Sequence, residues 1–178
     1  LQRLDAAARR RLVPVLREER VLAGLLDPGA ADLDVHPLHQ GFLRSARAAG
    51  ASLVRDARVD ALQRDGERWI VRAGAQAWRA EVVVDAAGAW ADELASLAGL
   101  PAIGLQPKRR AAFLFAPPAD IDSRAWPCVC GVDESWYFKP DAGLLLGSPA
   151  NADPVPAHDV RPEELDIATG IARIEAMT

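Results

Sequence analysis

No apolar run in this 178-residue sequence approaches the roughly 20 residues that a membrane-spanning helix requires, so we expect no membrane span. An excess of basic charge is also missing, since 21 Lys and Arg stand against 25 Asp and Glu. Phosphate backbones are bound by concentrated basic surfaces. The basic run at positions 9–11 is short and lies in a helical pattern, which favours a solvated helix face. We therefore expect no nucleic-acid partner.

Cysteine is scarce, with one residue at position 128 and one at position 130. In a β-strand this spacing places both side chains on one face, where a disulfide between them would be strained. We interpret Cys128 and Cys130 as unbridged thiols, buried or half-buried, in a reducing compartment such as the cytoplasm.

Histidine is equally scarce, and two of the three histidines lie close together. His36 and His39 are near Asp32 and Asp34, which could be imagined as a set of metal ligands. Helix capping and solvent exposure explain the same residues equally well. We expect no metal site here or at the two cysteines, because two sulfurs alone do not complete one.

Half of the residues are apolar, which is enough for the core of one or two domains. Alternating and β-branched patterns predict strands, and spacings of three and four predict helices. Gly66, Gly74 and the segment 139–143 mark hairpin turns. Strands are predicted near 21–26, 57–62, 69–71, 77–79, 82–84, 111–115, 136–138 and 144–146. Helices are predicted near 1–19 with a break at Pro14, 34–50, 89–99 and 162–176.

The segment 81–92 reads as a buried strand, a turn of small residues and an amphipathic helix. Ala86, Ala87 and Gly88 would expose backbone at the carboxyl end of the strand Val82-Val83-Val84, where open α/β sheets bind ligands. An ordinary strand-to-helix connection with tight packing would give the same pattern, so these residues alone leave both interpretations open.

This segment resembles the FAD-binding strand of the D-amino-acid oxidase superfamily, which includes glycine oxidases, sarcosine oxidases and related dehydrogenases. Three other stretches resemble the same family in the same order. Residues 25–38 are similar to the family's segment that leads into its central helix. Gly50-Ala51-Ser52, together with Val59, is similar to the strand that supplies backbone contacts to adenine. Residues 107–110, 136–140 and 143–148 are similar to its substrate-domain sheet.

The resemblance implies an α/β plus α+β fold, in which part of an FAD-binding Rossmann-like domain joins an antiparallel-sheet substrate domain, both incomplete. Residues 34–100 would form the partial FAD-binding α/β domain. Residues 1–33 and 101–160 would form the substrate-domain sheet region, and 161–178 a terminal helix.

Several parts of the family pattern are missing. The sequence has no Gly-x-Gly, so the phosphate-cradling fingerprint and the acidic ribose-binding residue after it are absent, as is the C-terminal glycine-rich stretch. Asp85 stands where the family more often has Asn, and Arg110 where a Gly is common. We therefore expect a fragment of a longer enzyme that alone binds FAD weakly or not at all.

The resemblance implies hydride transfer from a carbon bearing an amine to the flavin, leaving an imine that water hydrolyses. The substrate would be a small amine or amino acid. Because the cofactor carries this chemistry, we assign no catalytic residue in this chain. Residues expected to line FAD are Val59, Ala86, Ala87, Gly88, Ala89 and Trp90.

Two further residues are candidates for substrate binding. Tyr137 would lie in the pocket, or would be an ordinary aromatic residue on a half-buried sheet. Arg109 would face the flavin or bind a carboxylate, or would form a surface ion pair. Two other classes of function also stay open: a non-catalytic α/β binding module, or an accessory subunit descended from an oxidase. We also expect self-association or rearranged packing that covers Val82-Val83-Val84, because exposed strand edges are rarely left unpaired.

Overall fold

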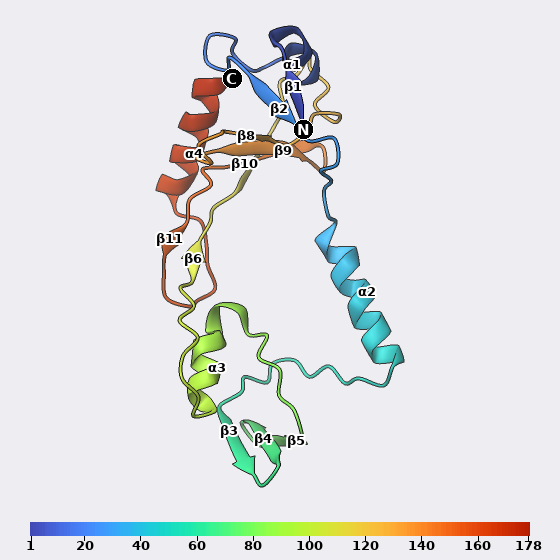
Figure 1. The fold of residues 1–178 in the computed structure, drawn as a ribbon, viewed down its shortest axis with the longest axis vertical. Helices are drawn as coiled ribbons and strands as arrows, with labels where there is room; N and C mark the ends of the chain where they lie inside the picture. The colour runs from blue at the N-terminus through green and yellow to red at the C-terminus, as the bar shows by residue number, and fades with distance from the viewer. The chain divides into compact units, whose positions relative to one another are not determined.

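The computed structural model describes all 178 residues, which form two compact units. We call the first the sheet unit (Leu1–Gly29 and Pro107–Thr178) and the second the meander unit (Ala30–Gln106). Figure 1 shows the elements of each. Every strand pair in the chain is antiparallel, so the architecture is mixed α and β without a parallel sheet.

A four-stranded sheet organises the sheet unit, with strand order β7-β10-β9-β8. Its strands are β7 (Phe113–Phe115), β8 (Val129–Cys130), β9 (Tyr137–Asp141) and β10 (Leu144–Ser148). Strands β9 and β10 form the predicted hairpin, but the loop is only Ala142 and Gly143, with φ of 47° and 86°. Positive φ at both loop positions is typical of a type I′ turn, whose twist suits adjacent strands.

Shorter elements complete the sheet unit. Strands β1 (Gln2–Leu4) and β2 (Gly24–Leu26) pair with each other, as do β6 (Lys108–Arg109) and β11 (Asp153–Pro154). Helix α1 (Ala6–Leu12) begins at Asp5, whose carboxylate accepts a hydrogen bond from the Ala8 amide at 2.7 Å. The helix ends before Pro14, where a break was predicted, because proline cannot continue it. Residues 15–19, also predicted as helix, form turns instead.

One face of the four-stranded sheet forms the main core. Phe138 is 1% exposed and stacks on Trp136, with ring centroids 6.0 Å apart. Trp126 meets the same ring edge-on at 6.2 Å. Val13 of the α1 segment, Leu145 and Ile174 also belong to this cluster. Alternation along β9 leaves Tyr137 and Lys139 on the opposite face, because successive side chains of a strand point to opposite sides.

Helix α4 (Glu164–Met177) packs on this sheet through two glycines. A Cβ on Gly170 would lie 2.5 Å from the Phe113 ring, and a Cβ on Gly147 of β10 would lie 2.8 Å from Ile174 Cδ1. Both positions therefore require glycine for the close approach of helix and strand. Glu163 and Asp166 form a reciprocal capping box at the start of the helix.

The meander unit contains the predicted three-stranded meander: β3 (Ala61–Asp65), β4 (Arg68–Ala73) and β5 (Gln76–Ala80). Two-residue loops join the strands, and each begins with a glycine at positive φ: Gly66 at 61° and Gly74 at 57°. The turn η1 (Gly88–Trp90) and helix α3 (Ala91–Leu97) follow, and Ala91 and Ala95 are buried.

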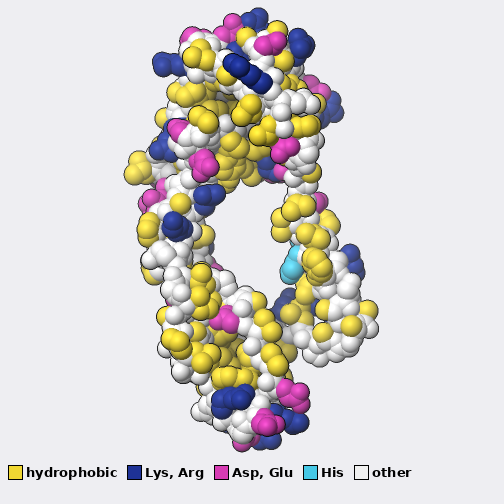
Figure 2. All heavy atoms as spheres, viewed as in Figure 1, with side chains coloured by type: hydrophobic (Ala, Val, Ile, Leu, Met, Phe, Trp, Pro, Cys, Tyr) yellow, Lys and Arg dark blue, Asp and Glu magenta, His cyan; other side chains and the backbone are white.

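Helix α2 (Val35–Ala48) lies close to the predicted range and ends as predicted at Gly50. The Ala51 amide donates to the Ala46 carbonyl at 3.0 Å, and the Gly50 amide to Arg47, which is the Schellman pattern. No residue of α2 is buried, and Phe42 is 68% exposed. Figure 2 shows hydrophobic side chains uncovered along this helix.

Several predicted elements differ from the structure. The strand predicted near 57–62 begins only at Ala61, in β3. Residues 2–4, predicted as helix, form β1, because pairing with β2 outweighs the local helical pattern. Val82-Val83-Val84, predicted as a strand buried on both faces, forms no strand, and Val82 and Val84 are 74% and 79% exposed. No strand of this chain lies beside them to accept a ladder of hydrogen bonds. Val83 is half-buried, but no packing covers Val82 and Val84.

No helix combines the length and the apolar character needed to cross a membrane. No three His, Cys, Asp or Glu side chains lie close enough together to hold a metal ion.

Candidate functional site

The turn before α3 carries five of the six residues expected to line a cofactor. Asp85 organises it, because its Oδ1 accepts a hydrogen bond from the Ala87 amide at 3.0 Å. Gly88 has a φ of 58°, and no atom lies within 4 Å of where its Cβ would be. Ala86 and Ala89 are exposed, and Trp90 is 38% exposed. The backbone of this turn is therefore open to close approach by a ligand.

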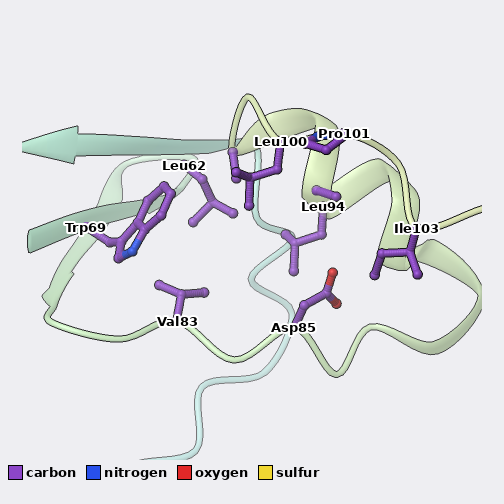
Figure 3. A pocket seen from close by; sticks show the side chains of 10 residues that line it. Leu62, Trp69, Val83, Asp85, Leu94, Leu100, Pro101 and Ile103 are labelled. Carbon is purple, nitrogen blue, oxygen red and sulfur yellow. The ribbon is translucent and has the colours of Figure 1, made fainter.

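A cavity of about 170 Å³ lies next to this turn within the meander unit. Figure 3 shows Leu62 and Trp69 reaching it from the meander, Leu94 from α3, and the Asp85 carboxylate as the charged group of an otherwise apolar lining. Pockets for drug-sized ligands measure about 300–1,000 Å³, so this cavity is too small for a dinucleotide. The lining is Leu62, Trp69, Val83, Asp85, Leu94, Ala95, Ala98, Leu100, Pro101 and Ile103.

Val59, the sixth expected cofactor residue, is half-buried and precedes β3 rather than lying within a strand. Neither Val59 nor the turn 86–90 lines the cavity. Arg58, the residue before Val59, forms an ion pair with Glu93 of α3 at 3.5 Å. This ion pair links the chain around Val59 to the helix that follows the turn. Asp60 accepts a hydrogen bond from the Gly74 amide at 2.6 Å and so ties this stretch to the meander.

Asp92 was not singled out from the sequence, yet its carboxylate organises the segment after α3. It accepts hydrogen bonds from the amides of Ile103, Gly104 and Leu105 at 2.8, 3.1 and 3.1 Å. These amides have no strand partner, so one carboxylate satisfies three donors. Only the placement of Asp92 in the first turn of α3 could have indicated this role from the sequence.

Tyr137 lies in β9 on the face of the sheet opposite the main core and is half-buried. It pairs with Ser148 of β10 on one side and with Cys130 of β8 on the other. Directly paired residues share a face, so Tyr137 and the Cys130 thiol project to the same side. Both cysteines are exposed, which corrects the expectation of buried or half-buried thiols, because β8 is an edge strand.

Arg109 lies in β6 with its side chain 13% exposed, and it forms ion pairs with three carboxylates. Its partners are Glu163, Asp166 at 3.0 Å and Asp153 at 3.8 Å. Desolvation lowers the pKa of the Arg109 guanidinium, but hydrogen bonds and charges from Glu163 and Asp166 outweigh it and raise the pKa above the ordinary value. The network holds the start of α4 against β6 and β11.

The residues of this chain could line a bound FAD molecule, but they include no loop that would bind its phosphates. The open turn at Gly88 would let a flat or extended ligand approach its backbone. The chain contains no Gly-x-Gly, and α3 has only seven residues. Little in this chain would bind the charge of a pyrophosphate.

The comparisons with known proteins agree on one family. The family model described as FAD dependent oxidoreductase matches residues 1–176. The mitochondrial dimethylglycine dehydrogenase of Homo sapiens is 31% identical over 140 residues, which is 76% of this chain and 16% of that protein. The mouse enzyme is 32% identical over the same share of each chain.

Solved structures share the fold. The L-proline dehydrogenase of P. horikoshii superposes with a TM-score of 0.84 at 19% identity, over 99% of this chain and 47% of that one. The glycine oxidase of Geobacillus kaustophilus gives a TM-score of 0.75 at 22% identity, over 99% of this chain and 46% of that one. The present chain thus spans about half of these structures and about one sixth of the dimethylglycine dehydrogenases. On the family match and these relatives, the chain belongs to the FAD dependent oxidoreductase family.

Proposed function

We propose that this chain contributes part of a flavoenzyme that oxidises the C–N bond of a small amine or amino acid. The family match over residues 1–176 carries this proposal. The names of the relatives support the substrate class. Dimethylglycine, proline, glycine and iminodiacetate all bear a carboxylate on a carbon next to an amine nitrogen.

In this proposal residues 34–100 contribute to the cofactor domain. FAD, when bound, would accept the hydride from the carbon next to the nitrogen. The chain's own contribution is shape: Val59 and Ala86 through Trp90 would line the cofactor, with Gly88 allowing backbone contact. Asp85 and Asp92 would hold the turn and the segment after α3 in place through their backbone hydrogen bonds.

Residues 1–33 and 101–160 would contribute to the substrate domain, with the helix at 161–178 packed behind the sheet. Tyr137 would present its ring and hydroxyl to the substrate from the face opposite the core. Contact of Arg109 with a substrate carboxylate stays a prediction. Such a carboxylate would compete with Glu163, Asp166 and Asp153 for the guanidinium, which favours a positioning role for Arg109.

The decisive experiment uses protein expressed from the complete coding sequence and purified with bound FAD. Under anaerobic conditions, glycine, dimethylglycine, proline and iminodiacetate are added in turn, and bleaching of the flavin absorbance is followed. We expect at least one of these amino acids to reduce the flavin and to release the corresponding imine hydrolysis product. Propionate, which has the carboxylate but no amine, is the matched control and should leave the flavin oxidised.

A second arm titrates FAD into the present chain alone, followed by flavin fluorescence. Each charge-assisted hydrogen bond lost with a missing phosphate cradle costs about 1.5–3 kcal/mol, so binding should be weaker by several orders of magnitude than in the complete flavoenzyme. Micromolar binding by the chain alone would mean that we have misplaced the phosphate site. Complete protein that binds no FAD would instead favour an accessory or binding role.

A further inference from the structure

The two cysteines of the sheet unit form a pair whose geometry suits a shared ligand. Their Sγ atoms lie 3.7 Å apart, and both residues are exposed. Cys130 is in β8, the edge strand of the four-stranded sheet, and Cys128 directly precedes that strand. Two sulfurs that touch at an exposed edge can be reached together by one small electrophile.

The distance between the two sulfurs distinguishes disulfide formation from binding of a shared ligand. A disulfide requires about 2.05 Å between sulfurs and Cα atoms about 4.4–6.8 Å apart. Residues two apart in a strand have Cα atoms roughly 6.4–6.8 Å apart, so a bridge here would lie at the limit of that range and be strained. Two sulfurs bound at about 2.3 Å to one centre lie about 3.8 Å apart if the centre is tetrahedral and about 3.4 Å apart if it is pyramidal with three bonds, both close to the distance observed. Chelation therefore needs little movement, whereas a disulfide needs a large one.

The sheet holds this arrangement in place. Val129, between the two cysteines, pairs with Phe138, and the Phe138 side chain is buried in the main core. Anchoring Val129 in this way keeps both thiols on the opposite face.

We propose that Cys128 and Cys130 form a bidentate site for a thiophilic electrophile that takes two thiolates at once, such as a trivalent arsenical carrying one organic group. Two thiolates satisfy such a centre because its organic group supplies the third bond, whereas zinc sites use three or four protein ligands. In the reaction, two S–H bonds and the arsenic–oxygen bond break, two arsenic–sulfur bonds form, and water leaves. No electrons are transferred. The site does not depend on the proposed oxidoreductase function.

The test uses phenylarsine oxide and the reduced 178-residue chain, with native mass spectrometry as the readout. We expect one phenylarsenic unit per chain, loss of both titratable thiols, and an adduct that a dithiol removes but an excess of monothiol does not. Each of C128S and C130S should bind about 10²–10⁴-fold more weakly, because a second attachment within one molecule raises affinity by that factor. Circular dichroism of both variants checks that they fold.

A matched control keeps two exposed thiols but breaks their spacing. The double substitution Cys130→Ser with Val132→Cys places the second thiol at a fully exposed position, four residues from Cys128. This variant should show weak, monothiol-sensitive adducts only. Two adducts on the unmodified chain, single-serine variants within tenfold of it, or spontaneous loss of two hydrogens as a disulfide would each overturn the proposal.

Discussion

At the scale of single residues, Ser148 shows how one buried hydroxyl joins two segments of backbone. The side chain is fully buried, donates to the Ala111 carbonyl at 2.6 Å, and accepts from the Ala150 amide at 3.0 Å. The two bonds tie the end of β10 to the stretch before β7. If the hydroxyl were removed, the Ala111 carbonyl and the Ala150 amide would both lose their hydrogen-bond partner.

We predict that Ser148→Ala lowers the free energy of unfolding of the sheet unit by about 1–3 kcal/mol, the cost of leaving buried polar groups unpaired. Urea denaturation followed by tryptophan fluorescence measures the change. Ser135→Ala removes a hydrogen bond to Asp133 at the surface, where water replaces it, and should cost less than about 0.5 kcal/mol. Equal losses in the two variants would contradict the role of burial.

Asp122 provides a prediction about pH. Hydrogen bonds from the Arg124 side chain and then its backbone amide, together with the Arg124 charge, lower the Asp122 pKa from 3.8 to about 2, despite some desolvation. A lowered folded-state pKa stabilises the fold above the unfolded-state value, and this contribution is lost as pH falls from 3.8 through about 2. We expect an NMR titration of the carboxyl carbon to give about 2, and Arg124→Ala to return it toward 3.8. An unchanged pKa in that variant would show that the ion pair does not form in solution.

At the scale of elements, contacts between helix and strand are set by residues that carry no side chain. Gly170 of α4 faces the Phe113 ring and Pro149, and a methyl group there would meet the ring at 2.5 Å. Gly41 of α2 is also in a helix, but its nearest atom is 3.9 Å away, at the end of the Arg44 side chain. Comparing the same substitution at the two glycines therefore separates the effect of helix propensity from the effect of packing.

We predict opposite signs for the same substitution at these two sites. Alanine in a helix is favoured over glycine by about 1 kcal/mol, so Gly41→Ala should stabilise α2 or leave it unchanged. Gly170→Ala should destabilise the sheet unit by about 1–3 kcal/mol, because the overpacking outweighs the propensity. Helical circular dichroism and urea denaturation test both. A stabilised Gly170→Ala variant would show that α4 can move away from the sheet at little cost.

The helices and hairpins that the sequence predicted well are those whose ends have local causes. Gly50 and Gly99 adopt positive φ and close their helices with backbone hydrogen bonds to residues a few positions earlier. Gly66 and Gly74 begin the two tight turns of the meander for the same conformational reason. Residues 2–4 differ, because their strand depends on a partner twenty residues away in β2.

At the scale of the whole chain, exposed apolar residues gather in the meander unit. Val82 and Val84 are 74% and 79% exposed, and Phe42 and Ile103 are both 68% exposed. Large exposed apolar patches on a protein mark an interaction site or an aggregation liability. Residues 81–87 also form no strand, so their backbone groups lie outside any strand ladder.

We predict that the isolated chain self-associates through residues 82–84. Sedimentation velocity over a range of concentrations should show a rising average mass, and the double substitution Val82→Lys with Val84→Lys should shift the chain toward monomer. Val132→Lys changes an even more exposed valine in the sheet unit and serves as the control. A monomer at every concentration would rule this prediction out.

The sequence by itself determined the family, the helices α2, α3 and α4, the meander and the β9–β10 hairpin, because their signals are local: periodicity, positive-φ glycines and the order of motifs. Only the tertiary structure decided the state of Val82-Val83-Val84, the exposure of the Cys128 and Cys130 thiols, and the engagement of Arg109 with three carboxylates. Each of these depends on which distant segment lies alongside. A β-branched run becomes a strand only when a neighbouring strand accepts its hydrogen bonds, and an arginine's partners come from wherever the fold brings carboxylates.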